Sequence, residues 1–123
     1  MKIQLVDDEP FLLKAMQREL RRYGDWETHS FTSAEDALEG LERHEYDIII
    51  SDYSMPKSSG VDYLQQVRQK QPNAKRVLLT AWADQQVLAD AINRAQVHCY
   101  WPKPWQVSQL LELMKSHEQA VQP

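Results

Sequence analysis

Residues 48–52 read Ile-Ile-Ile-Ser-Asp, so three consecutive β-branched side chains stand shortly before a carboxylate. A strand whose apolar residues do not alternate with polar ones is typical of the middle of a parallel sheet, where both faces are covered. The run therefore predicts a central strand and an α/β fold. Asp52 would then lie at the carboxyl end of that sheet, which makes it the first candidate for a functional residue.

Short β-like segments and segments of helical period alternate outward from this run. Four more strands are expected, at Ile3–Val6, Trp26–Phe31, Arg76–Thr80 and Val97–Trp101. Strands and helices that alternate at this length require right-handed crossovers and a parallel sheet with helices on both sides. The sequence therefore predicts a doubly wound, five-stranded parallel sheet with five helices, and we expect the strand order 2-1-3-4-5.

Apolar residues three and four positions apart predict the five helices. The residues expected to face the core are, in chain order, Leu13, Met16, Leu20 and Tyr23; Ala34, Ala37, Leu38 and Leu41; Val61, Leu64 and Val67; Val87, Leu88, Ala91, Ile92 and Ala95; Val107, Leu110, Leu111 and Met114. Ser33 stands three residues before Asp36 in a capping pattern, and Asp84 precedes the fourth helix as a candidate cap.

The composition is that of one ordinary globular domain. The chain has 123 residues, of which 42% are hydrophobic and 26% charged, and its formal net charge is −4. Binding to nucleic acid needs an excess of Lys and Arg, so nucleic acid is not expected as a direct partner. The single cysteine, Cys99, cannot form an internal disulfide, and no run approaches the ~20 apolar residues that span a membrane. We therefore expect a cytoplasmic protein that has no membrane partner.

Polar side chains follow four of the five expected strands. Asp7 and Asp8 follow the first strand, Asp52 the third, Thr80 the fourth and Lys103 the fifth. In the expected strand order the first and third strands are neighbours, so the three carboxylates converge beyond the carboxyl ends, where such sheets bind ligands. Each pair would repel by about 4 kcal/mol at ~4 Å and an effective dielectric constant of ~20. Mg²⁺, which prefers carboxylate, water and phosphate oxygens, would offset this repulsion together with Lys103.

A metal ion, an ammonium group, a hydroxyl and a carboxylate are the groups that phosphoryl transfer uses. Asp52 is the candidate nucleophile, since an aspartate can take up a phosphoryl group as an acyl phosphate. Each residue also has an ordinary interpretation. Asp7 and Asp8 could be acids at a helix start, and Asp52 could be a turn residue. Thr80 could be a strand terminus or a helix cap, and Lys103 an exposed loop lysine. Their coincidence at neighbouring strand ends favours a site.

Four short motifs stand at these strand ends: Asp7-Asp8; Asp52-Tyr53-Ser54-Met55-Pro56 with Gly60; Thr80-Ala81; and Lys103-Pro104. As a set they resemble the receiver domain of bacterial two-component response regulators, including the chemotaxis regulators, over essentially the whole chain. The resemblance implies a flavodoxin-like fold. It also implies a receiver domain over residues 1–119 and a polar tail, or the start of a linker, over residues 120–123.

The resemblance implies a phosphoacceptor with Mg²⁺ as cofactor. Asp52 would accept a phosphoryl group from a sensor histidine kinase or a histidine phosphotransfer protein. The metal ligands would be Asp7, Asp8, Asp52 and the backbone carbonyl of Ser54. In this interpretation the protein is a regulatory phosphoacceptor and not an enzyme, with its own phosphotransfer and slow autodephosphorylation as side activities.

Three further residues acquire roles from the resemblance. Thr80 would hydrogen-bond one phosphoryl oxygen, and Lys103 would pair with another. Tyr100 would be the switch aromatic, which turns inward when Thr80 is drawn toward the phosphoryl group. A cis bond between Lys103 and Pro104 would aim the lysine inward. The face made by the fourth helix, fifth strand and fifth helix would then bind an output domain or a second copy of the chain.

Two other functions stay open at this point. A Mg²⁺-dependent phosphatase with an aspartyl nucleophile would need a second acid two residues later, and Ser54 occupies that position. A phosphorylation-independent interaction module would keep the acidic pocket for stability alone. Incubation with Mg²⁺ and a small phosphodonor tests these alternatives: a phosphoryl adduct on Asp52 supports a receiver, and turnover of many phosphodonor equivalents favours a phosphatase.

Some residues depart from the commonest receiver pattern or have no assigned role. Trp82 flanks the route by which water would reach the acyl phosphate, and its bulk is expected to slow hydrolysis. Pro102 removes a backbone donor just before the lysine. Cys99 is expected to pack. The four histidines, which show no metal-ligand spacing, are His29, His44, His98 and His117.

Overall fold

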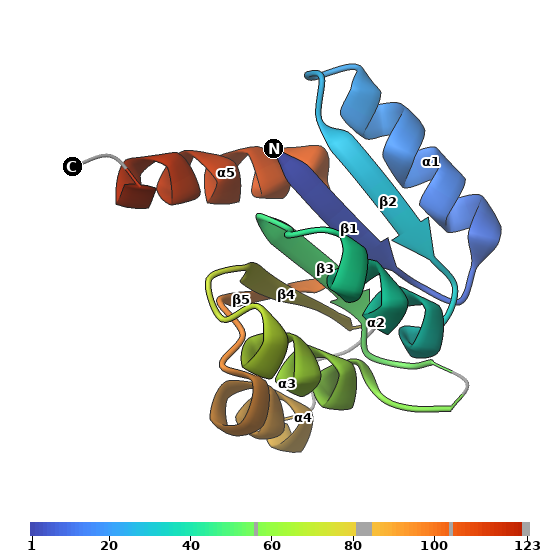
Figure 1. Cartoon of the computed structure of the whole chain (residues 1–123), viewed down its shortest axis with the longest axis vertical. Helices are drawn as coiled ribbons and strands as arrows, with labels where there is room; N and C mark the ends of the chain where they lie inside the picture. Colours follow the sequence, from blue (N-terminus) through green and yellow to red (C-terminus); the bar gives the residue numbers. More distant parts are fainter. Residues whose placement is uncertain (56, 81–84, 104, 122–123) are drawn as a thin grey trace.

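The computed structural model describes residues 1–55, 57–80, 85–103 and 105–121, with side chains up to residue 115. Its elements are β1 (Lys2–Val6), α1 (Pro10–Arg21), β2 (Glu27–Phe31), α2 (Ala34–Arg43), β3 (Ile48–Asp52), α3 (Gly60–Lys70), β4 (Lys75–Thr80), α4 (Gln85–Asp90), the π-helical turn η1 (Ala91–Ala95), β5 (Cys99–Pro102) and α5 (Val107–Val121). The strands form one parallel sheet in the order β2-β1-β3-β4-β5 (Figure 1). The predicted doubly wound α/β fold and its strand order are confirmed.

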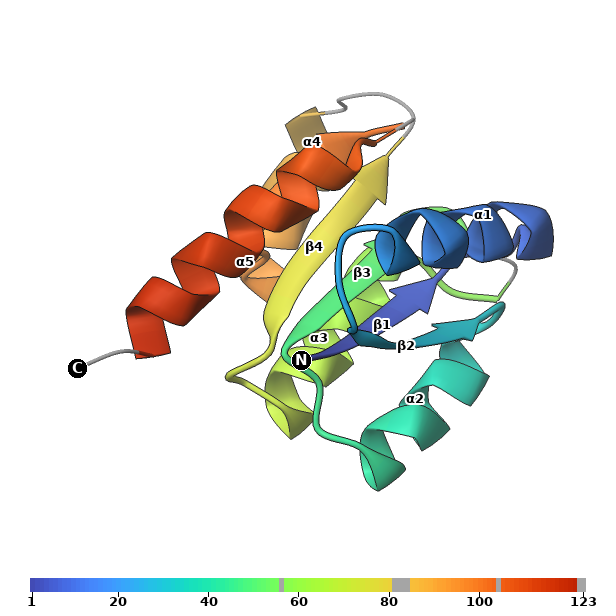
Figure 2. The same ribbon diagram turned by 90° about the horizontal axis from the view of Figure 1, so that it is seen from above.

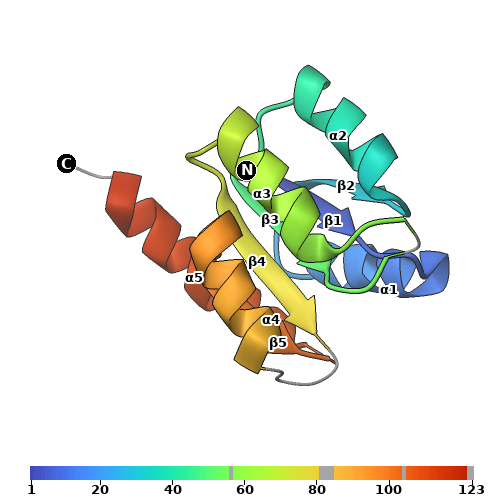
Figure 3. The same ribbon diagram turned by 90° about the horizontal axis from the view of Figure 1, so that it is seen from below.

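Helices cover both faces of the sheet. α1 and α5 lie on one face, whereas α2, α3 and α4 lie on the other (Figures 2 and 3). Each face has its own apolar cluster, and Ile49 belongs to one while Ile48 and Ile50 belong to the other. All three isoleucines are buried. The absence of polar alternation in this run therefore reflects a strand covered on both sides, as expected.

Several predicted strand boundaries are wrong: β1 and β4 each begin one residue earlier than expected, at Lys2 and Lys75, and β5 ends at Pro102 rather than Trp101. β2 begins at Glu27 rather than Trp26, and β5 begins at Cys99 rather than Val97. The residues before β5 close the π-helical turn instead. Gln96 adopts a left-handed backbone conformation with φ of 47°, and the N–H of Val97 donates to the carbonyl of Ala91 at the start of η1 (3.3 Å).

Two residues expected to face the core are exposed. Tyr23 is 53% exposed because α1 already ends at Arg21. Ile92 is 56% exposed because the helical period changes after α4. In the π-helical turn the two alanines at positions 91 and 95 are buried, and Ile92 faces outward. A periodicity of 3.6 residues does not anticipate this change.

Side chains cap the helices that precede and follow β3. Ser33 accepts a hydrogen bond from the N–H of Asp36 (3.2 Å), which confirms the predicted cap of α2. Ser59 caps α3 in the same way, by accepting from the N–H of Asp62 (3.1 Å). The candidate cap Asp84 lies outside the described residues. No helix in the described part of the chain is long and apolar enough to cross a membrane.

A buried arginine anchors η1 to the start of β4. The guanidinium group of Arg76 donates to the carbonyls of Ala95 (2.8 Å), Ala74 (3.0 Å), Pro72 (3.1 Å) and Gln96 (3.2 Å). Burial lowers the pKa of this side chain, and its four carbonyl partners satisfy donors that would otherwise be costly to bury. The carboxyl end of the α4–η1 segment is therefore fixed at the end of β4 that lies away from Thr80.

Candidate functional site

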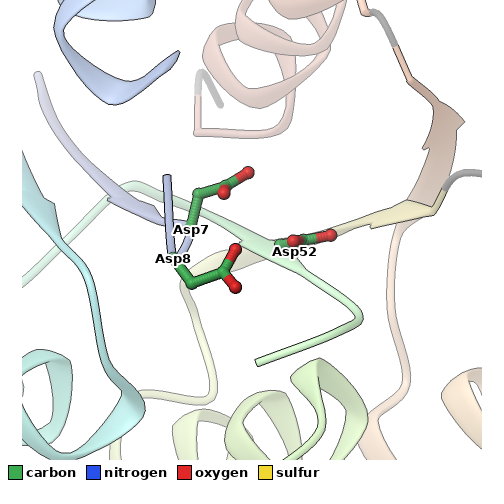
Figure 4. Close-up of side chains that lie close together, drawn as sticks. All are labelled: Asp7, Asp8 and Asp52. Atoms are coloured by element: carbon green, nitrogen blue, oxygen red, sulfur yellow. The ribbon is translucent and has the colours of Figure 1, made fainter. Parts of the chain in front are cut away.

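Three aspartates meet at the carboxyl end of the sheet. Asp7 and Asp8 follow β1, and Asp52 ends β3, which pairs directly with β1. One carboxylate oxygen of each lies within 4.8 Å of the others (Figure 4). Asp7 is 1% exposed and Asp52 is 6% exposed, whereas Asp8 is exposed. The strand order thus brings the predicted carboxylates together, with one of them facing solvent.

The turn after β1 orients Asp7. Its N–H donates to the carbonyl of Phe31 (3.1 Å), which continues the pairing with β2, and its Oδ1 accepts from the N–H of Glu9 (3.0 Å). α1 then begins at Pro10, where the missing N–H is tolerated because the first N–H groups of a helix have no partner within it. The carboxylate of Asp7 is thereby held in place by the turn.

The ammonium group of Lys103 lies between two of the carboxylates. Its Nζ is 3.0 Å from Oδ2 of Asp7 and 3.0 Å from Oδ2 of Asp52. The N–H of Lys103 donates to the carbonyl of Thr80 (3.0 Å), and Pro102 pairs with Thr80 at the end of β5. Pro102 therefore removes a backbone donor without taking Lys103 away from the carboxylates. We call Asp7, Asp8, Asp52 and Lys103 the carboxyl-end site.

The charges in the carboxyl-end site do not balance. Burial raises the pKa of Asp52, and the charges of Asp7 and Asp8 raise it further, while the hydrogen bond from Lys103 opposes both effects. Burial disfavours the charge on Lys103, but its hydrogen bonds to Asp52 and Asp7 raise its pKa overall. Counted over the whole site, one ammonium group stands against three carboxyl groups. A set of oxygen donors with excess negative charge suits a hard divalent cation such as Mg²⁺.

Ser54 and Thr80 flank this site. Thr80 is 4% exposed and ends β4, which pairs with β3. Ser54 lies in the loop after β3 and forms an antiparallel bridge with Ser59, just before α3. The N–H of Tyr53 donates to the carbonyl of Leu79 (2.8 Å), so the loop starts from a position fixed by β4. Both residues thus lie at the carboxyl end of the sheet, where the sequence placed them.

The aromatic residues of β5 differ in exposure. Tyr100 is 45% exposed, whereas Trp101 is 7% exposed and stacks on Trp105 with 5.4 Å between ring centroids. Cys99 packs against the same apolar cluster, and burial raises the pKa of its thiol to about 11, as expected for a packing residue. Four residues that the sequence analysis placed in the motifs or beside the site lie outside the described residues: Pro56, Ala81, Trp82 and Pro104.

A second group of polar side chains, which sequence spacing does not reveal, lies toward the opposite end of the strands. The rings of His29 and His44 have centroids 4.5 Å apart. Nδ1 of His29 is 2.7 Å from the hydroxyl of Tyr46, and Nζ of Lys2 is 3.2 Å from Nδ1 of His44. Glu27 pairs with both Lys2 and His29. We call these five residues the amino-end cluster; the register of β1 with β2 and the end of α2 bring them together.

Comparison with known proteins places this arrangement in a family. Residues 3–115 match the family model of the response regulator receiver domain. The hydrogenase transcriptional regulatory protein HoxA of Bradyrhizobium diazoefficiens is 35% identical over 113 residues, which are 92% of this chain and 23% of HoxA. The chemotaxis protein CheY of Listeria monocytogenes is 29% identical over 118 residues, which cover 94% of this chain and 96% of CheY. The chain thus spans about a quarter of HoxA and nearly all of CheY.

Solved structures agree with the sequence matches. The signal receiver domain of an HD domain-containing protein from Pseudomonas fluorescens superposes with a TM-score of 0.87 at 30% identity, covering 97% of this chain and 87% of that one. The response regulator TrrA of Thermotoga maritima, solved in complex with Mg²⁺-BeF, gives a TM-score of 0.81 at 29% identity, with 94% and 97% coverage. With a family match over most of its length, this chain belongs to the receiver domains of two-component response regulators.

Proposed function

We propose that Asp52 is the phosphoacceptor of this receiver domain and that its phosphoryl group comes from a phosphohistidine of a sensor kinase or of a histidine phosphotransfer protein. The placement of Asp52 carries the proposal, because this buried carboxylate lies beside two other acids and 3.0 Å from the ammonium group of Lys103. An Asp52 oxygen would attack phosphorus while the phosphorus–nitrogen bond breaks. The imidazole would leave with the electron pair and take up a proton from solvent.

Four groups of this chain would hold Mg²⁺: the carboxylates of Asp7, Asp8 and Asp52, and the backbone carbonyl of Ser54. The fit rests on the donor set, which offers carboxylate oxygens within 4.8 Å of one another and excess negative charge. When bound, Mg²⁺ supplies positive charge beside the phosphoryl oxygens. The Mg²⁺-BeF complex of the related TrrA supports this assignment.

Lys103 and Thr80 would bind the phosphoryl group after transfer. Lys103 spans Asp7 and Asp52, and Asp52 loses its own carboxylate charge when it becomes an acyl phosphate. A phosphoryl oxygen would then replace that carboxylate as the partner of the ammonium group. The hydroxyl of Thr80, at the end of the neighbouring strand, would donate to a second phosphoryl oxygen.

Tyr100 and the face formed by α4, β5 and α5 would carry the signal outward. Leu78 pairs with Tyr100 and Thr80 pairs with Pro102, so the proposed hydroxyl donor and the exposed tyrosine lie on adjacent strands. A movement of Thr80 toward the phosphoryl group would favour an inward position of Tyr100. Such a shift biases a partner only through contacts that differ between the two states. An output domain or a second copy of the chain would be that partner.

Several finer assignments belong to the same proposal. The domain would extend over residues 1–119, and the family match itself covers residues 3–115. The protein would act in the cytoplasm, and it would catalyse its own phosphotransfer and slow autodephosphorylation. A phosphatase with an aspartyl nucleophile fits less well, because Ser54 cannot provide the acid that such an enzyme needs two residues after the nucleophile.

Incubation with acetyl phosphate and Mg²⁺, followed by intact mass measurement, tests the proposal. We expect one phosphoryl adduct on the wild type, none on Asp52→Asn, and a normal adduct on Asp25→Asn, which changes an exposed acid away from the site. An equal adduct on Asp52→Asn would contradict the assignment. A wild type that binds Mg²⁺ but never forms an adduct would favour an interaction module. Turnover of many phosphodonor equivalents, faster than slow autodephosphorylation allows, would favour a phosphatase.

A further inference from the structure

We propose that Gly60 is a positioning residue for the phosphoacceptor. The absence of a side chain at Gly60 sets the spacing between Asp52 and the backbone carbonyl of Ser54. This inference rests on the proposed function of Asp52, because it concerns the geometry in which that residue would bind Mg²⁺ and receive a phosphoryl group.

Gly60 is the first residue of α3, and it lies against the main chain of Asp52. A Cβ atom at Gly60 would overlap the carbonyl oxygen of Asp52, and it would lie 2.9 Å from the carbonyl carbon and 3.0 Å from Cδ1 of Leu78. No glycine in the described part of the chain has a positive φ, so the backbone of Gly60 is open to any residue. Glycine is required here for space and not for conformation.

The main chain of Asp52 has little freedom to move aside. Asp52 ends the central strand β3 and pairs with Leu79 of β4, and the hydroxyl of Ser51 donates to its carbonyl (3.0 Å). On the other side, Gly60 opens a helix whose next turns are anchored in the core by the buried residues Val61 and Leu64. A side chain at Gly60 would therefore push a strand end and a helix start apart.

The loop between Asp52 and Gly60 would transmit that displacement to Ser54. The N–H of Gly60 donates to the carbonyl of Tyr53 (2.7 Å), and Ser54 forms its antiparallel bridge with Ser59. Whichever side gives way, the distance between the Asp52 carboxylate and the Ser54 carbonyl changes. Both groups are proposed ligands of the same metal ion.

The size of the displacement sets the expected effect. Nonbonded carbon atoms are most stable at about 3.5–4.0 Å, so relieving the contact with the carbonyl carbon takes roughly half an ångström or more. Misplacing a reacting group by ~1 Å can lower a rate by about 100-fold. We therefore expect Gly60→Ala to slow phosphorylation by at least about tenfold.

Gly24 provides a matched control. The three heavy atoms nearest to a Cβ atom at Gly24 would all belong to the side-chain ring of Trp26, the nearest at 3.0 Å. Gly24 follows α1, at the end of the helix away from the carboxyl-end site. Gly24→Ala therefore adds the same methyl group to a glycine that does not contact Asp52.

The test compares wild type, Gly60→Ala and Gly24→Ala by three measurements. These are the Mg²⁺ dissociation constant with MgCl₂ alone, the initial rate of adduct formation from acetyl phosphate at saturating Mg²⁺, and the urea unfolding transition. For Gly60→Ala we expect a dissociation constant at least about tenfold higher and a rate at least about tenfold lower in a protein that still unfolds cooperatively. Gly24→Ala should match the wild type in both quantities.

The remaining outcomes decide against one proposal or the other. A folded Gly60→Ala with unchanged Mg²⁺ affinity and rate overturns the positioning role, even if its unfolding midpoint falls. Should Gly60→Ala unfold in buffer, the same comparison is made in trimethylamine N-oxide, which favours the folded state. A wild type that binds Mg²⁺ but forms no adduct contradicts the proposed function, and the Mg²⁺ dissociation constants then decide the role of Gly60 alone.

Discussion

The carboxyl-end site and the amino-end cluster lie toward opposite ends of the same strands, and they differ in how their charges are balanced. In the amino-end cluster, Nζ of Lys2 lies 3.6 Å from Glu27 and 3.2 Å from His44, and His29 lies 3.4 Å from Glu27 and 2.7 Å from Tyr46. Each polar group there has a complementary partner within the cluster. At the carboxyl end, by contrast, one ammonium group faces three carboxylates.

The comparison teaches that a gathering of titratable side chains does not by itself mark a site. Both ends gather such groups, but only the carboxyl-end site combines burial with excess charge of one sign. Burial raises the pKa of Asp52, so its ionised form is held at a cost that a cation can relieve. The amino-end cluster has no comparable excess for a ligand to relieve.

The largest effect should follow from removing the one cation of the carboxyl-end site. Without its ammonium group, Lys103→Met leaves the phosphoryl oxygens short of a charged donor, and we expect adduct formation from acetyl phosphate to slow by about 100-fold. Mg²⁺ affinity should not fall, because an ammonium group that competes for Asp7 and Asp52 is gone. Lys14→Met, on the exposed side of α1, is the control. Loss of Mg²⁺ binding in Lys103→Met would contradict this account.

A smaller effect on Mg²⁺ affinity should distinguish substitutions of two acids that lie at opposite ends of the sheet. Asp7→Asn removes one carboxylate from the proposed metal ligands, and we expect the Mg²⁺ dissociation constant, measured by calorimetry, to rise about tenfold, or ~1.4 kcal/mol. Asp47→Asn changes an acid at the other end of β3, where Oδ2 accepts from the N–H of Lys2 (2.8 Å), and should leave Mg²⁺ binding unchanged. If the two substitutions raised the Mg²⁺ dissociation constant equally, the proposal that Mg²⁺ binds at the carboxyl-end site would be contradicted.

A substitution within the amino-end cluster should change stability and not function. Tyr46→Phe deletes the hydroxyl that lies 2.7 Å from Nδ1 of His29, and we expect the free energy of unfolding to fall by about 1 kcal/mol. Mg²⁺ affinity and adduct formation should match the wild type. Tyr23→Phe, at an exposed tyrosine, should alter neither stability nor function. Slower phosphorylation of Tyr46→Phe would mean that the two ends are coupled.

The smallest effect concerns the pH dependence of stability. Because the pKa of Asp52 is raised in the folded protein, the folded state binds more protons than the unfolded state above the ordinary value of 3.8. The contribution of Asp52 to stability is therefore complete below that value and is lost as pH rises through the folded pKa. Asp52→Asn should gain stability over the metal-free wild type as pH rises, in urea unfolding at a series of pH values. A constant difference across the series would argue against the raised pKa.

The sequence predicts the architecture and the contents of the carboxyl-end site because both depend on local patterns. The isoleucine run of β3 and the polar residues at strand ends follow from periodicity and from the geometry of parallel sheets. The exposure of Ile92 was mispredicted because a π-helical turn interrupts the regular period. The contacts of His29 with His44 and of Gly60 with Asp52 were missed because they depend on register and on the packing of a helix start against a strand end.

The central claim is that Asp52, and no group of the amino-end cluster, accepts the phosphoryl group. Peptide mass mapping after incubation with acetyl phosphate and Mg²⁺ tests it most directly, because histidines can also form phosphoryl adducts. We predict a single adduct, on the peptide that contains Asp52, which is lost in Asp52→Asn. An adduct on a peptide with His29 or His44, or an adduct that persists in Asp52→Asn, would contradict the account.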